Sequence, residues 1–194
     1  MNQLVLLAKS AVENFVKEGK IIEVPEDLPE DFLKRKAGVF VTIYTKYQIQ
    51  NTKCELRGCI GTYLPTKENI AEETIRNAIA AATEDYRFGP IQKEELPYLS
   101  YTVYILSYPE PVKNIEELDP KKFGVIVKTT PFVYPNQEDV VFNGHFIAKT
   151  GLLLPDLEGV DTIEKQISIV CQKGGIDPER EKIFIYKFTV DKYQ

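Results

Sequence analysis

A short run of the chain, residues 55–61, places an arginine, a thiol and two glycines within what could be one strand. Side chains alternate between the two faces of a strand, so Leu56 and Ile60 are predicted to point to the core. Arg57 and Cys59 would then point together to the opposite surface. Because a guanidinium beside a thiol favours the thiolate, this pair is a candidate catalytic pair or anion-binding site.

The two glycines of this run, Gly58 and Gly61, remove side-chain bulk, so either a ligand or another backbone segment could come close. The amides at the start of the following helix would add positive potential if they faced the same space. The structural alternative stays open. Cysteines outside disulfides are often buried, Glu55 could pair with Arg57, and Gly61 could serve only a turn.

The cysteine and histidine content argues against a metal site. Cys54 and Cys59 are separated by four residues, whereas structural zinc sites use four ligands, usually at closer spacing. Cys171 is distant in sequence, and His145 is the single histidine. An odd number of cysteines without an export signal indicates reduced thiols. We therefore predict no metal and no cofactor.

Hydrophobic periodicity predicts an α+β fold, in which helices cover one face of a largely antiparallel sheet. Residues 1–194 are expected to form a single domain, with two subdomains as an alternative and no clear linker. The segment 23–37 is predicted to be a surface connector, and Asn143-Gly144 a hairpin turn. Thr66 is the predicted N-cap of the second helix. Helices are predicted over 3–18, 66–85 and 163–173, and strands over 38–46, 54–60, 98–106, 123–129 and 182–190.

Composition limits the class of partner. The net charge is −5 and the pI is about 5.1, which argues against non-specific nucleic-acid binding. No apolar run approaches the length needed to cross a membrane, and the amino-terminal segment lacks the pattern of a signal peptide. We therefore expect a soluble, cytoplasmic protein that binds neither nucleic acid nor membrane.

The motif LRGCIG, Leu56–Gly61, resembles the hallmark hexapeptide of the AMMECR-domain family, whose bacterial members are called AmmeMemoRadiSam system protein A. The resemblance extends over most of the chain. Further matching segments lie at residues 37–43, 75–88, 95–112, 121–128, 151–166 and 171–178. The chain departs from the family pattern at Tyr86, where proline is usual, at Gly89, and in a longer stretch over 130–150 that contains His145.

The resemblance implies a two-part α+β fold and an association with Memo-like and radical-SAM proteins, which tend to be encoded together with family members. It implies no established activity. Two functions are therefore considered. The first is an accessory or binding protein that docks such a partner. The second is a thiol-dependent enzyme, or a protein that binds a small anionic ligand, using Cys59 and Arg57 in a cleft.

Four further residues follow the motif in the next predicted helix and at its end. Arg76 and Asn77 lie in the middle of the helix, where an asparagine is mildly unfavourable and is more readily explained by a hydrogen bond to a neighbouring loop than by ligand binding. Asp85 and Arg87 could pair and fix the end of the helix. Through the family's Asp-x-Arg-Phe pattern, they could also border the same cleft as Arg57 and Cys59.

Overall fold

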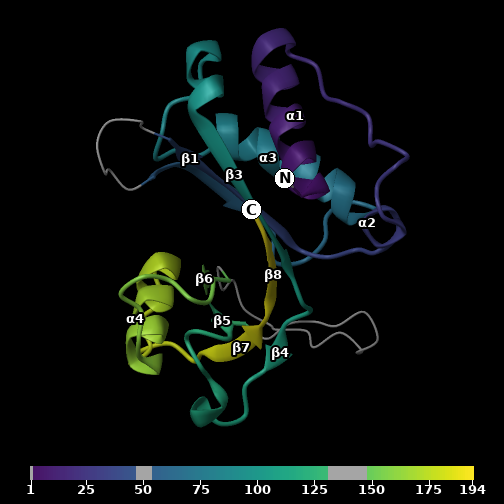
Figure 1. Cartoon of the computed structure of the whole chain (residues 1–194). Helices are drawn as coiled ribbons and strands as arrows, with labels where there is room; N and C mark the ends of the chain where they lie inside the picture. Colours follow the sequence, from purple (N-terminus) through teal and green to yellow (C-terminus); the bar gives the residue numbers. More distant parts are fainter. Residues whose placement is uncertain (1, 47–53, 131–147) are drawn as a thin grey trace. The chain divides into compact units, whose positions relative to one another are not determined.

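The computed structural model describes residues 2–46, 54–130 and 148–194, which form two compact units. The first unit comprises Met1–Tyr108 and Asp191–Gln194, and the second comprises Pro109–Val190. Each unit contains a four-stranded sheet and at least one packed helix (Figure 1). The α+β fold class predicted from the sequence is therefore confirmed.

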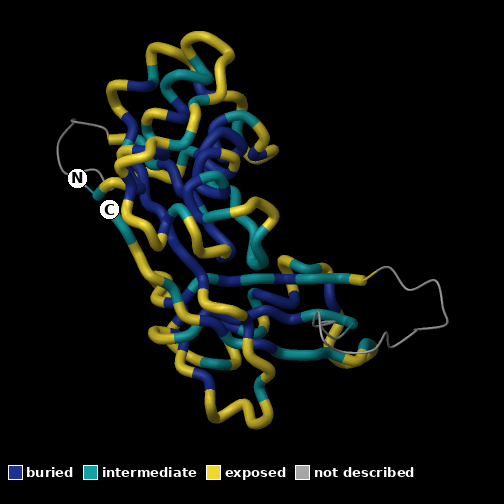
Figure 2. Tube along the Cα trace, turned by 90° about the vertical axis from the view of Figure 1, so that its right-hand side faces the viewer, coloured by how far each residue is buried: buried dark blue, intermediate teal, exposed yellow. Residues whose placement is uncertain are grey.

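In the first unit, helices cover one face of a sheet with the strand order β2-β1-β3-β8. The strands are β2 (Glu55–Gly61), β1 (Val39–Thr45), β3 (Leu99–Leu106) and β8 (Val190–Tyr193). The helical elements are α1 (Gln3–Glu18), α2 (Glu30–Lys34), α3 (Ile70–Thr83) and the 3-10 helix η1 (Lys93–Tyr98). Residues at alternate positions of β1 and β3 face α1 and α3 and form the core. Figure 2 shows the buried residues of the chain in dark blue.

Helix α1 shows how the sequence sets these boundaries. The side chain of Asn2 accepts a hydrogen bond from the Leu4 N–H at 2.9 Å and caps the first turn. Gly19 ends the helix in the left-handed conformation, with φ of 71°, which glycine adopts without steric cost. Leu4, Ala8 and Ala11, three to four residues apart, are fully buried, so the apolar stripe of the helix faces the core.

The second unit has a sheet with the order β4-β7-β5-β6, in which every described pair is antiparallel. Helix α4 packs on this sheet, capped at its start by Thr162 and at its end by Gly175. The elements are β4 (Glu110–Pro111), η2 (Ile115–Glu117), β5 (Gly124–Lys128), β6 (Thr150–Leu153), α4 (Ile163–Gly174) and β7 (Phe184–Phe188).

The structure corrects three expectations about the elements. The predicted connector contains helix α2, whose Phe32 is buried in the core, so this segment is not only a surface link. Helix α3 is capped by Asn69, which accepts a hydrogen bond from the Glu72 N–H, and not by Thr66. The predicted last strand is divided after Phe188: β7 belongs to the second sheet, and β8 completes the first.

One expectation, the hairpin turn at Asn143-Gly144, lies outside the described residues, and so does His145. In the part of the chain that is described, no helix combines the length and the apolar character needed to cross a bilayer.

Candidate functional site

The motif occupies β2, an edge strand of the first sheet, and a β-bulge interrupts its pairing with β1. The register passes from Ile43 opposite Gly58 to Tyr44 opposite Leu56, so Arg57 has no cross-strand partner in the ladder. The bulge also shifts Leu56 to the face that carries Cys59. Leu56 is 38% exposed, and the prediction that it lies in the core is therefore wrong.

Arg57 is held by the segment that follows α3. Its guanidinium forms a two-pronged ion pair with Glu95, with nitrogen–oxygen distances of 2.6 and 3.0 Å. A third hydrogen bond runs from Arg57 Nη1 to the carbonyl oxygen of Gly89 at 2.9 Å. This ion pair keeps the pKa of the Glu95 carboxyl below its usual value, although partial burial opposes that shift. Glu55, considered from the sequence as a partner of Arg57, does not take this role.

Gly58 and Gly61 both allow close packing within the unit. A Cβ atom at Gly58 would lie 2.1 Å from the carbonyl oxygen of Ala81, because α3 passes directly over β2 at this point. A Cβ atom at Gly61 would lie 2.2 Å from the ring of Phe40, its partner on β1. Of the two possibilities raised by the sequence, the neighbour that approaches Gly58 is therefore backbone.

The backbone of Cys59 is tied to the loop after α3 by Asp85. The Cys59 N–H, on the open edge of the sheet, donates a hydrogen bond to Asp85 Oδ2 at 2.8 Å. Asp85 also forms an ion pair with Arg87 at 2.7 Å, and Arg87 Nη2 lies 3.5 Å from the Cys59 carbonyl oxygen. The guanidinium beside Cys59 is thus that of Arg87, whereas Arg57 is bound to Glu95.

The interactions between Asp85 and Arg87 favour the charged form of both side chains. The hydrogen bond from Arg87 is the main reason why the pKa of the Asp85 carboxyl is lowered, and the bond from the Cys59 N–H adds to this effect. The same ion pair raises the pKa of Arg87. Asp85 is buried while the Arg87 side chain is 45% exposed, so the guanidinium of this ion pair faces solvent and the carboxylate does not.

The Cys59 thiol lies on the face of the sheet opposite the helices. Its sulfur is 3.2 Å from Thr42 Oγ1, and Thr42 pairs in turn with Thr102. On the same face, the hydroxyls of Tyr44 of β1 and Tyr104 of β3 are hydrogen-bonded to each other. Burial raises the pKa of both phenols. They therefore remain protonated near neutral pH, and neither they nor Thr42 can serve as a base toward the thiol.

A buried carboxylate that the sequence did not single out anchors the loop after the motif. Glu73 is fully buried and accepts hydrogen bonds from the Thr66 and Lys67 N–H groups at 2.6 and 2.8 Å and from the Thr62 hydroxyl at 2.8 Å. Asn77 Nδ2 donates to the Val39 carbonyl oxygen at 2.9 Å. The first turns of α3 thus bind the loop that precedes the helix. The sequence feature that could have indicated this contact is Glu73, a charged residue among the apolar residues of the helix.

Arg76 borders a different surface, the outer side of α3. It forms a two-pronged ion pair with Glu84, at 3.1 Å for both nitrogen–oxygen distances. Both residues line a groove of about 640 Å³ between α3, the end of α1 and the segment that follows α1. Its apolar lining consists of Phe15, Ile21, Ile22, Val24, Ile75 and Ile79.

No metal site emerges from the described residues: nowhere do three His, Cys, Asp or Glu side chains gather in a way that could hold an ion.

The three cysteines differ in exposure: Cys54 is exposed, Cys59 is half-buried, and Cys171 is buried in the second unit.

Comparison with known proteins matches nearly the whole chain to one protein family. A family model described as AMMECR1 matches residues 5–193. A protein of Thermotoga maritima is 49% identical over 183 residues, which cover 94% of this chain and 92% of that protein. A protein of Clostridium acetobutylicum is 40% identical over 98% of this chain, although the chain spans only 35% of that longer relative.

A solved structure has the same fold. The crystal structure of uncharacterized protein PH0010 from Pyrococcus horikoshii aligns with a TM-score of 0.77 and 32% sequence identity. The alignment covers 97% of this chain and 88% of that protein.

Proposed function

The chain belongs to the AMMECR1 family, and we propose that it acts there as a cytoplasmic, non-catalytic binding protein that docks a Memo-like or radical-SAM partner. One observation carries this proposal: the guanidinium and the backbone of the motif are engaged within their own unit. The Arg57 guanidinium is bound by Glu95, and the Cys59 N–H is bound by Asp85. A ligand that used these groups would first have to break those bonds.

The glycines support the same conclusion. Space beside a glycine serves a ligand only if it is open, and at Gly58 it is filled by the carbonyl oxygen of Ala81. The thiol lies 3.2 Å from the Thr42 hydroxyl, within the sheet of the same unit. The motif thus accounts for the packing of β2 against α3 and leaves recognition to another surface.

The groove beside α3 is the surface we assign to the partner. Ile21 is 68% exposed at its margin, and buried isoleucines of α3 form its base. Apolar surface that stays exposed beside a concave floor is typical of a protein-binding site. Charged side chains border it: Lys67 and Arg76 are basic, and Glu23, Glu72 and Glu84 are acidic. A partner would therefore insert an apolar side chain between polar contacts.

The alternative function, a thiol-dependent enzyme or a protein that binds a small anionic ligand at Cys59, has one observation in its favour. The Arg87 side chain is 45% exposed beside Cys59 and could attract an anion, although it is itself ion-paired with Asp85. Arg57, the cation first considered for that role, is neutralised by Glu95. We therefore rank this alternative second and test it together with the first.

The test is co-purification of tagged protein from its native host, with partners identified by mass spectrometry. Ile21→Asp places a charge in the groove at an exposed position, so the fold should be retained while partner recovery falls about tenfold or more. Leu157→Asp, an equivalent change at an exposed leucine of the second unit, is the matched control and should leave recovery unchanged.

Cys59→Ala separates the two functions. A binding protein should retain its partner and the output of the pathway after this change. If partner recovery is unaffected by Ile21→Asp but pathway output is abolished by Cys59→Ala in a folded protein, the proposal fails and the thiol-dependent function takes its place.

A further inference from the structure

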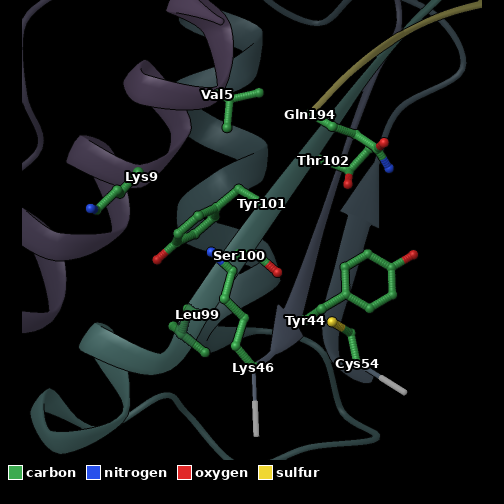
Figure 3. A pocket seen from close by; sticks show the side chains of 10 residues that line it. All are labelled: Val5, Lys9, Tyr44, Lys46, Cys54, Leu99, Ser100, Tyr101, Thr102 and Gln194. Carbon is green, nitrogen blue, oxygen red and sulfur yellow. The ribbon is translucent and has the colours of Figure 1, made fainter. Parts of the chain in front are cut away.

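A second cavity of the first unit, of about 470 Å³, lies beside β3 and apart from the groove. Its lining includes Cys54, which directly precedes β2, and Tyr44, the partner of Leu56 on β1. It is bounded by α1 on one side and by β3 and the end of β1 on the other (Figure 3). Val5 and Leu99 form an apolar part of its wall, and Lys9 and Lys46 contribute two ammonium groups. A cavity with an apolar wall and a few convergent polar groups is the usual form of a small-molecule site.

Tyr101 gives this cavity a polar group that the protein leaves unsatisfied. The side chain lines the cavity and is only 5% exposed, and its hydroxyl has no hydrogen-bond partner among the described residues. Buried hydroxyls without a partner are uncommon because the lost hydration is costly. Burial, and secondarily the Glu13 carboxylate, raises the pKa of this phenol, so it stays protonated and able to donate.

Two lysines bring positive charge to the same cavity. In Figure 3, Lys46 extends from the end of β1 toward the ring of Tyr101, whereas Lys9, on the facing helix, is turned away from that ring. The described ion pair of Lys9 is a long one, 3.7 Å to Glu13, whose other oxygen is bound more closely by Lys17 at 3.0 Å. Glu13 therefore neutralises Lys9 only in part, and the cavity retains cationic character.

We propose that this cavity binds a small organic anion. Its phosphate or carboxylate group is held by Lys46, Lys9 and the Tyr101 hydroxyl, and its apolar portion rests against Val5 and Leu99. The anion would accept the hydrogen bond that Tyr101 cannot make within the protein. This site is independent of the partner groove, so the two proposals can fail separately.

Isothermal titration calorimetry with phenyl phosphate, benzoate and phenol tests the proposal on the full chain. Phenyl phosphate and benzoate distinguish the two anionic groups, and phenol carries the apolar ring alone. Tyr101→Phe removes only the unpartnered hydroxyl and should leave the fold intact. Lys46→Gln removes one charge from the cavity. Lys20→Gln removes the charge of an exposed lysine that follows α1 and does not line the cavity.

We expect one-to-one binding of at least one of the two anions, tighter than that of phenol. Tyr101→Phe and Lys46→Gln should each weaken it about tenfold, the value of a lost charge-assisted hydrogen bond. Lys20→Gln should leave it unchanged. The proposal is overturned if neither anion binds at millimolar concentration, if phenol binds as tightly, or if both cavity variants bind as the parent protein does.

Discussion

Cys59 and Asp85, separated by 26 residues in the chain, are joined by a hydrogen bond from the Cys59 N–H to the Asp85 carboxylate at 2.8 Å. Through its ion pair with Arg87, the same carboxylate fixes the loop that follows α3. One buried side chain thus connects the edge of the sheet to the end of the helix that covers it.

Replacing Asp85 by alanine should destabilise the first unit. The change leaves the Cys59 N–H without its acceptor and Arg87 without its partner, which should lower the free energy of unfolding by about 2 kcal/mol. Urea denaturation followed by circular dichroism measures this. Asp27→Ala, at an exposed aspartate, is the control and should change stability by less than about 0.5 kcal/mol. Equal midpoints for the two variants would contradict the structural role of Asp85.

Acid should weaken the protein through Asp85 and Glu95. The pKa of each carboxyl is lowered in the folded state, chiefly by Arg87 and Arg57 respectively, from ordinary values of 3.8 and 4.5. Their contribution to stability is therefore complete above those values and is lost as the pH falls through them toward the folded-state pKa. Urea midpoints measured from neutral pH downward should fall most steeply below about pH 4.5.

Glu95→Gln provides the check on this dependence. It removes one titrating carboxylate that is paired in the folded state, so the loss of stability on acidification should become shallower than in the parent. An identical pH profile for the variant would show that the Arg57 ion pair contributes nothing to the acid response.

Gly58→Ala should be strongly unfavourable although it adds one methyl group. The new Cβ would meet backbone, the Ala81 carbonyl oxygen at 2.1 Å, and neither α3 nor β2 can yield without disturbing the core. We expect a loss of about 2 kcal/mol or more, measured by thermal and urea denaturation. Gly89→Ala is the matched control, because nothing lies within 4 Å of its added Cβ. Similar stability of both variants would argue against the close approach of α3 to β2.

The three thiols should react with a disulfide reagent in order of exposure. Cys54 is exposed, Cys59 is half-buried, and Cys171 is buried, where burial also raises the pKa of its thiol. Labelling followed by peptide mass spectrometry should therefore give Cys54 the fastest rate and Cys171 the slowest. A Cys59 rate above that of Cys54 would reveal an activated thiol and favour the enzymatic alternative.

Local patterns of sequence predicted much of the fold. The helix over residues 3–18 was located correctly because its apolar spacing and the stop signal at Gly19 act within the segment itself. The strands that became β1, β2, β3 and β5 were likewise found to within one or two residues. Leu56 was misplaced because strict alternation assumes an uninterrupted strand, and the bulge at Arg57 is visible only in the pairing with β1.

The site was less accessible to prediction, because its contacts join distant segments. Arg57 was identified as a charged residue of the motif, but its partner Glu95 lies 38 residues further along, in a 3-10 helix that the sequence pattern did not indicate. Asp85 and Arg87 were paired correctly because they are neighbours in sequence. Whether any of these residues binds a ligand stays a prediction.

The division of the last strand fixes an order of assembly. Since β8 follows the described strands of the second unit in the chain, the sheet of the first unit can receive its fourth strand only after residues 109–189 have been synthesised. Until then β3 is an outer strand with open backbone groups, the kind of edge on which nascent chains can pair wrongly. The sheet of the first unit therefore stays one strand short until residues 190–193 have been synthesised.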